Sequence, residues 1–168
     1  MTEPHLPDPD AYYPAAAGRE HPGPAAVRLP KAIFESIVAH ARAAAPNEAC
    51  GIVVGDRPAA EGGVARRWAP LRNALASPVR YSIDPDELLR LTIETDDADE
   101  VFWAIVHSHV ASPARPSPTD VRQSFYPDAL YVIVSLRAEE SDPVTGAESV
   151  RAWRILEGAV HEVEVGRT

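Results

Sequence analysis

The distribution of hydrophobic residues along the chain predicts strands in several short segments. Short, nearly continuous apolar runs rich in β-branched residues are typical of strands in a sheet. Such runs occupy residues 50–55, 64–69, 101–106, 129–136, 149–156 and 159–165. The run at 101–106 has almost no polar interruption, which predicts a strand buried on both faces.

Helices are expected where apolar residues recur every three to four positions. One such segment covers residues 29–45, where Pro30 suits a first helical turn. Another begins at Asp84 and Pro85. Its apolar face is expected to consist of Leu88, Leu89, Leu91 and Ile93. A short helix over 121–125 is expected to follow a turn that places Asp120 in its first turn. Strands and helices in this order predict an α/β fold, a mixed β-sheet flanked by helices.

The N-terminal segment differs in composition from the rest of the chain. Residues 1–26 contain many prolines and few large apolar side chains, so they cannot bury enough surface to offset the entropy of ordering. We therefore predict a flexible arm over 1–26 and a single domain over 27–168. His5 and His21 of the arm could in principle reach a metal, although the composition favours a plain extension.

Composition and charge narrow the class of protein. The 168 residues are 45% hydrophobic and 24% charged, as in ordinary soluble domains, and contain no apolar run long enough for a membrane span. An excess of 25 acidic over 16 basic residues gives a formal charge of -9, which argues against a nucleic-acid partner. A single cysteine excludes an internal disulfide, and the first residues do not form a signal peptide. We expect a cytoplasmic protein.

The residues that carry chemistry are concentrated directly after the run at 101–106. His107 and His109 are two positions apart, so a strand would present both side chains on one face, with Ser108 pointing away. Seven residues separate His109 from Ser117, and two further residues separate Ser117 from Asp120. Two imidazoles and one carboxylate are the ligands that zinc takes when a fourth position stays open for water. A bare His-x-His can arise by coincidence on a strand, but the added Ser and Asp argue against coincidence here.

A further carboxylate lies at Glu48, just before the apolar run that starts at Cys50. On its own, Glu48 could equally be an exposed residue of a helix-to-strand loop. Cys50 is most simply a small buried residue, because no neighbouring cation in the sequence would lower the pKa of its thiol.

Together these segments resemble a known family. The run HSHVASPARPSPTD resembles the JAMM motif of the MPN-plus metallopeptidases, and PNEACGIVVG at 46–55 is similar to the segment that carries that family's glutamate. A looser similarity to small bacterial members extends through 72–89, so the resemblance covers about residues 27–136. Val110 departs from the pattern, because many bacterial relatives have proline there. The resemblance implies the MPN/JAMM fold, which has a cytidine-deaminase-like architecture.

The resemblance also implies a function. It makes His107, His109 and Asp120 the ligands of Zn²⁺, Glu48 the general acid–base, and Ser117 the donor of a hydrogen bond to the tetrahedral oxyanion. The expected enzyme is a zinc metallopeptidase that cleaves peptide or isopeptide bonds after the Gly-Gly tail of a ubiquitin-like or sulfur-carrier protein. Small bacterial relatives release cysteine from such a carrier. Two alternatives stay open, namely a catalytically silent MPN-type interaction module and a non-peptidase zinc hydrolase. The complete set of five residues argues against the silent module.

Overall fold

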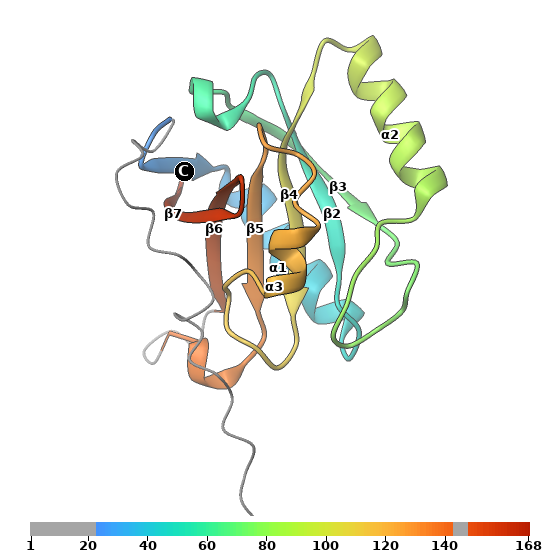
Figure 1. The fold of residues 1–168 in the computed structure, drawn as a ribbon, viewed down its shortest axis with the longest axis vertical. Coiled ribbons are helices and arrows are strands. Elements are labelled where there is room, and N and C mark those ends of the chain that lie inside the picture. Colours follow the sequence, from blue (N-terminus) through green and yellow to red (C-terminus); the bar gives the residue numbers. More distant parts are fainter. Residues whose placement is uncertain (1–22, 143–147) are drawn as a thin grey trace, which may run out of the picture.

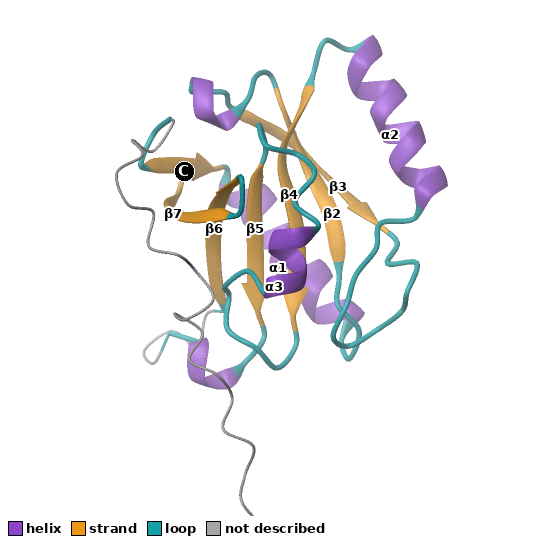
Figure 2. Ribbon diagram, in the orientation of Figure 1, coloured by secondary structure: helices purple, strands orange, loops and turns teal. Residues whose placement is uncertain are grey.

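The computed structural model describes residues 23–142 and 148–168, which form one mixed β-sheet with helices on both faces (Figures 1 and 2). The seven strands lie in the order β1-β7-β6-β5-β4-β2-β3. Their bounds are β1 Ala26–Leu29, β2 Cys50–Gly55, β3 Ala65–Leu71, β4 Val101–His109, β5 Leu130–Ser135, β6 Ser149–Leu156 and β7 Ala159–Arg167. The β4/β5 and β1/β7 pairs are parallel and the other pairs are antiparallel. The predicted α/β class is confirmed.

The sheet divides the apolar core into two layers, and helices cover both. Helix α1 (Lys31–Ala44) packs Ile33 and Ile37 against one face of the sheet. Helices α2 (Pro85–Asp97) and α3 (Pro118–Arg122) lie on the opposite face of the sheet. There Leu91 and the partly buried Val121 belong to a second apolar cluster, which includes Ile105 and Ile133 of the sheet. Short 3₁₀ turns occur at Ala59–Glu61 and Ala138–Glu140. Within the described ranges, no helix is long and apolar enough to cross a membrane.

Strand β4 lies inside the sheet, between the two apolar layers, and its side chains point alternately into one layer and the other. It pairs with β2 on one side and β5 on the other. Ala104 and Val106 enter the α1 layer, whereas Ile105 enters the layer of α2 and α3. His107 and His109 have the same parity as Ile105, so the end of β4 directs both toward the α3 side of the sheet.

The beginning of the domain differs from the prediction. The helix expected over 29–45 begins at Lys31, and Ala26–Leu29 form β1 instead. This strand pairs with the far end of β7, Ala26 opposite Glu164, a contact between the two ends of the chain that local spacing does not reveal. Of the arm predicted over 1–26, residues 1–22 lie outside the described residues.

The predicted apolar face of α2 was partly wrong. Leu89 and Ile93 are 60% and 53% exposed, while Leu91 and Thr95 are buried. A helix can bury only one stripe, and positions four apart share it. Thr95 can join Leu91 in that stripe because its hydroxyl donates to the Leu91 carbonyl oxygen at 3.0 Å. The predicted start of this helix is confirmed, since the Asp84 carboxylate caps it by accepting from the backbone N–H groups of residues 86 and 87.

Candidate active site

The buried end of β4 brings two imidazoles together. The Nε2 atoms of His107 and His109 are 3.1 Å apart, and the two residues are only 1% and 4% exposed. Both residues pair with β5, His107 opposite Ile133 and His109 opposite Ser135, while His107 also pairs with Cys50 of β2. Strands on both sides therefore fix the backbone of His107. The prediction that the two histidines share one face is confirmed.

The N-terminus of α3 brings a carboxylate to the same point. Ser117 is the N-cap, and its hydroxyl accepts a hydrogen bond from the Asp120 backbone N–H at 3.1 Å. In return, the Asp120 Oδ2 accepts from the Ser117 backbone N–H at 2.7 Å, which completes a capping box. Oδ1 lies 3.4 Å from His107 Nε2 and Oδ2 lies 3.3 Å from His109 Nε2. The hydrogen bonds that start the helix thus also orient the carboxylate.

The loop between β4 and α3 holds His109 in one tautomer. His109 Nδ1 lies 2.6 Å from the carbonyl oxygen of Pro113, and because a carbonyl only accepts, Nδ1 must carry the proton. The Nε2 lone pair is then free to bind a metal. The buried Ser135 fixes the same loop by donating to the Ser112 carbonyl oxygen at 2.8 Å.

These three side chains fit a zinc ion. Two ligands at the usual zinc distances in a tetrahedral arrangement are about 3.3 Å apart. The two imidazole Nε2 atoms are 3.1 Å apart, and each has one Asp120 oxygen beside it, Oδ1 at 3.4 Å from His107 and Oδ2 at 3.3 Å from His109. With one ligand atom from each residue, all three atoms lie within 4.8 Å of one another. The donor set of two imidazole nitrogens and one carboxylate is also the one zinc accepts with an open fourth position.

The pKa shifts of the three candidate ligands bear on whether they can bind a metal ion. Burial alone would raise the pKa of Asp120, but His107, His109 and the Ser117 N–H together hold it well below its usual range. Burial lowers the pKa of His107, although Asp120 opposes this effect. For His109, burial has the largest single effect and lowers the pKa, but Asp120, the Pro113 carbonyl and Glu48 together outweigh it and raise the pKa. Asp120 is therefore ionised and His107 neutral at neutral pH, the forms in which they bind metal.

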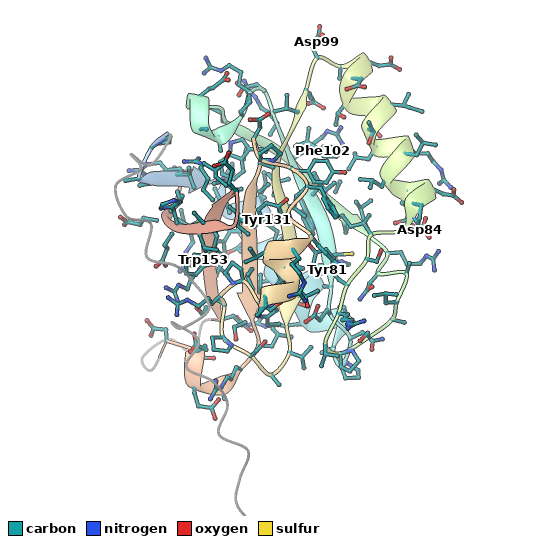
Figure 3. The ribbon with its side chains drawn as sticks, in the orientation of Figure 1. Tyr81, Asp84, Asp99, Phe102, Tyr131 and Trp153 are labelled. Carbon is teal, nitrogen blue, oxygen red and sulfur yellow. The ribbon has the colours of Figure 1, made fainter. Side chains whose placement is uncertain are left out.

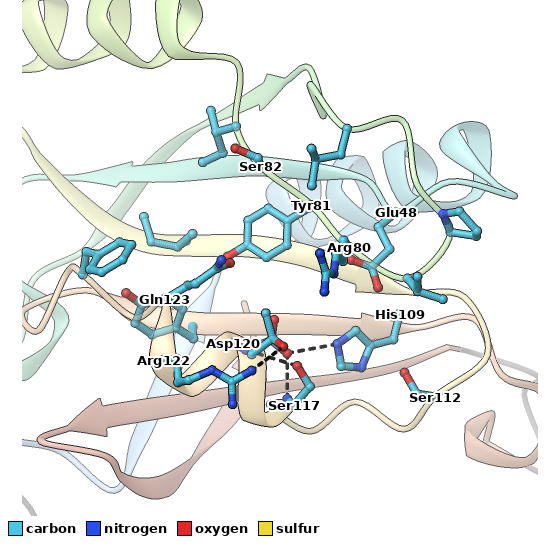
Figure 4. Close-up of a pocket in the computed structure, with 18 of the residues that line it drawn as sticks. Glu48, Arg80, Tyr81, Ser82, His109, Ser112, Ser117, Asp120, Arg122 and Gln123 are labelled. Atoms are coloured by element: carbon cyan, nitrogen blue, oxygen red, sulfur yellow. Dashed lines mark hydrogen bonds and ion pairs between the residues drawn. The ribbon is translucent and has the colours of Figure 1, made fainter.

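Glu48 lies beside this cluster, at the entrance to β2 (Figure 4). It is only 6% exposed, and burial raises the pKa of its carboxyl to about 7, with His109 lowering it and Asp120 raising it by smaller amounts. A carboxyl with a pKa near neutrality can both accept and return a proton at neutral pH.

All these groups except His107 line one groove of about 900 Å³. One wall is the loop over 75–83 and the other is α3 with the segment that follows it. Leu75, Val79 and Phe125 on these walls are 52%, 76% and 75% exposed. Tyr81 stacks on the His107 ring, with centroids 4.3 Å apart, and lies with Tyr131 on the α3 side of the sheet (Figure 3). The groove is open and partly apolar, which suits an extended polypeptide segment.

Comparison with known families identifies this arrangement. Residues 30–156 match the family described as prokaryotic homologs of the JAB domain. The chain belongs to this family. The JAMM resemblance seen in the sequence is thereby confirmed, and so is the class of enzyme, a JAMM-type peptidase.

Individual relatives and solved structures are similar to most of the chain. A CysO-cysteine peptidase from Mycobacterium tuberculosis is 42% identical over 137 residues, which are 79% of this chain and 85% of the relative. A desampylase from Haloferax volcanii is 34% identical over 106 residues, 60% of this chain and 74% of the relative. A solved protein from Desulfitobacterium hafniense is 35% identical with a TM-score of 0.69, covering 84% of this chain and 92% of that one. A JAB1/MPN domain protein from Archaeoglobus fulgidus, at 18% identity and a TM-score of 0.51, covers 83% of this chain and 98% of its own and shares the fold.

Three residues at this JAB site were not recognised from the sequence. Tyr81 stacks on a candidate ligand, and Asn73 donates to the Glu48 carbonyl oxygen at 3.0 Å. Ser108 points away from the histidine pair as predicted, and its hydroxyl accepts from the Ala49 N–H at 2.8 Å, next to Glu48. A signal existed only for Asn73, because an asparagine after a strand and before a proline-containing loop often bonds nearby backbone.

Proposed function

We propose that this JAB-family chain is a zinc-dependent peptidase that hydrolyses the amide bond following the Gly-Gly tail of a ubiquitin-like or sulfur-carrier protein. The observation that carries the proposal is the convergence of three candidate metal-ligand atoms, from His107, His109 and Asp120, at the groove that Glu48, His109, Ser117 and Asp120 line. A binding module that lacks catalysis has no need for this combination.

The site residues have distinct parts in the proposed reaction. Zinc held by His107, His109 and Asp120 would supply Lewis acidity that makes water nucleophilic at neutral pH. The Glu48 carboxylate takes a proton from the attacking water and returns it to the nitrogen of the leaving amine, a part that its position beside the candidate ligands allows. Ser117 uses its oxygen to cap α3, so its hydroxyl hydrogen stays available for the oxyanion of the substrate.

The nature of the substrate is supported by the groove and by the relatives. The exposed apolar side chains on both walls, Leu75, Val79 and Phe125, extend the contact surface beyond the reacting bond. The relatives include a CysO-cysteine peptidase, a desampylase and, at 31% identity, a probable TtuB-protein conjugate cleaving protease from Thermus thermophilus. Since the chemistry at Glu48 and Ser117 would serve any amide, selectivity must come from contacts with the carrier outside the scissile bond.

A comparison of two substrates tests the proposal. We expect a Gly-Gly-tailed carrier with a C-terminal cysteine adduct to be cleaved with a far higher kcat/KM than its isolated tail peptide. A carrier joined to a lysine side chain would show whether an isopeptide is accepted as well. Glu48→Gln is the control for hydrolysis by contaminating enzymes. Equal kcat/KM values for carrier and tail would remove the carrier as the substrate and leave a general peptidase. Cleavage of other amides but no peptides would indicate a non-peptidase zinc hydrolase.

A further inference from the structure

The side chain of Asn73 makes four hydrogen bonds, all to backbone. Its Nδ2 donates to the carbonyl oxygens of Glu48 and Arg80, each at 3.0 Å. Its Oδ1 accepts from the N–H groups of Leu75 and Ser82, each at 3.1 Å. Two donated and two accepted bonds use the full ordinary capacity of a carboxamide. Asn73 therefore closes the loop over 73–82 on itself and attaches that loop to the residue that carries the proposed acid–base.

The backbone of Glu48 is held from both sides by this loop. The Glu48 N–H donates to the carbonyl oxygen of Ser77 at 2.8 Å, and the Glu48 carbonyl accepts from Asn73. Strand β2 begins only at Cys50, so no strand ladder includes Glu48. The adjoining Ala49 is anchored differently, since its N–H donates to the Ser108 hydroxyl and its carbonyl accepts from the Ser108 N–H. The loop, rather than the sheet, thus sets the position of Glu48.

The same loop forms a wall of the groove. Leu75 and Val79 line it with exposed side chains, and Tyr81 covers the ring of His107. One short segment therefore contacts the space for the substrate, a candidate metal ligand and the backbone of the proposed base. A misplacement of about 1 Å at a reacting group can cost about 100-fold in rate.

From this arrangement we infer that Asn73 is a positioning residue, which holds Glu48 in place for proton transfer by tying its carbonyl to the groove wall. The catalytic part of this inference rests on the proposed function. The structural part, that Asn73 fixes the position of Glu48, does not.

The test uses the full chain and two substitutions. Asn73→Asp keeps the size and the acceptor oxygen but loses the bonds donated to Glu48 and Arg80. Thr92→Val on α2 is the control, because it also removes a bond from a side chain to a backbone carbonyl, that of Leu88, but lies outside the groove-wall loop. We expect Asn73→Asp to lower kcat by about 10- to 100-fold, with KM much less affected and zinc content unchanged. Thr92→Val should leave kcat unchanged. A rise in KM with kcat unchanged, or an equal loss of kcat in both variants, would overturn the inference.

A double-mutant cycle asks whether Asn73 acts through Glu48. In a Glu48→Gln background the proton-transfer group is already absent, so adding Asn73→Asp should reduce the residual single-turnover rate little further. If the two losses multiplied as independent effects, Asn73 would act on something other than Glu48 and the assignment would be wrong. Asn73→Ala serves the same cycle if the aspartate variant does not fold.

Amide hydrogen exchange gives a measurement that needs no substrate. In Asn73→Asp the Glu48 amide, which donates to Ser77, should exchange faster than in the unsubstituted protein. The Ala49 amide, bonded to Ser108, should keep its protection. Unchanged exchange at Glu48 would contradict the inference even for an active enzyme. If no carrier adduct were cleaved, faster exchange at Glu48 would still support the structural part, so the two proposals can fail separately.

Discussion

Replacing Glu48 by glutamine should stabilise the zinc-free protein while it removes activity. The carboxyl of Glu48 is 6% exposed and burial raises its pKa from 4.5 to about 7, so holding it ionised costs the folded state free energy. A neutral glutamine of nearly the same shape avoids that cost. The proposed acid–base would then be a residue whose position lowers stability, a common trade-off at active sites.

The sign and the size of the stability change on Glu48→Gln follow from proton linkage. Because the folded-state pKa lies above the ordinary value, the folded protein binds more protons than the unfolded chain between pH 4.5 and about 7, and its stability falls as the pH rises through that window. The loss is about 1 kcal/mol at about pH 5.5 and reaches about 3 kcal/mol at about pH 8. Glu48→Gln should recover that loss, which at about pH 8 corresponds to a rise of roughly 6 to 12 °C in Tm for a domain of this size.

Thermal and denaturant unfolding of chelator-treated protein at several pH values measures this effect. Glu164→Gln on β7 is the matched control, because Glu164 is exposed and its substitution should leave Tm unchanged at every pH. A gain of the same size at about pH 5.5 and pH 8 would mean that repacking, and not the buried charge, is responsible. No gain at about pH 8 would show that the Glu48 carboxylate is well solvated, which would refute the reasoning. Bound zinc should shrink the difference, because a cation beside Glu48 favours the ionised form.

Three further outcomes are expected. Metal analysis should find one zinc per chain, lost in His107→Ala and His109→Ala but kept in His161→Ala; a full equivalent of zinc in the first two would disprove the ligand assignment. Ser117→Ala should lower kcat by about 10² to 10³ and the free energy of unfolding by about 1 kcal/mol. The reason is that the same hydroxyl caps α3 and is proposed to donate to the oxyanion; kinetics measure the first loss and denaturant titration the second. The Cys50 thiol, whose pKa burial raises to about 12, should resist thiol reagents near pH 8 until the protein unfolds, and rapid labelling of folded protein would contradict its burial.

The strands and helices with strong local patterns were predictable, and those defined by distant contacts were not. The apolar run before His107 forms an inner strand because it needs partners on both sides, and β2 and β5 supply them. Strand β1 has only four residues, and its partner β7 lies at the other end of the chain. The face of α2 was ambiguous for a similar reason. Leucine or isoleucine occupies more than one side of that helix, and only the packed sheet decides that Leu91 is buried and Ile93 exposed.

The residues of the candidate site also fall into those that local sequence predicts and those that it does not. His107, His109, Ser117 and Asp120 lie within fourteen consecutive positions. The strand period predicted that the two histidines share a face, and the spacing of Ser117 and Asp120, together with the family resemblance, assigned these two residues to the same site. Glu48 approaches them across the sheet, and only the family resemblance pointed to it. Asn73 and Tyr81 act through partners on other segments, Glu48 and His107 respectively, and no local spacing encodes those contacts.

The proposed metal ligands and the proposed acid–base therefore have separate supports in this fold. The candidate ligands depend on the paired end of β4 and on the cap of α3, where Ser117 and Asp120 fix one another. Glu48 depends on the loop around Asn73, whose contact with the ligands is the stacking of Tyr81 on His107. Because the loop also lines the groove, a change there can alter substrate contacts and the placement of the base together while the ligand set stays assembled. A change at the α3 cap acts on the ligands first. The candidate ligands are thus anchored at the buried end of β4 and at the α3 cap, and the exposed apolar residues of the groove wall lie on the segment that also positions the proposed acid–base.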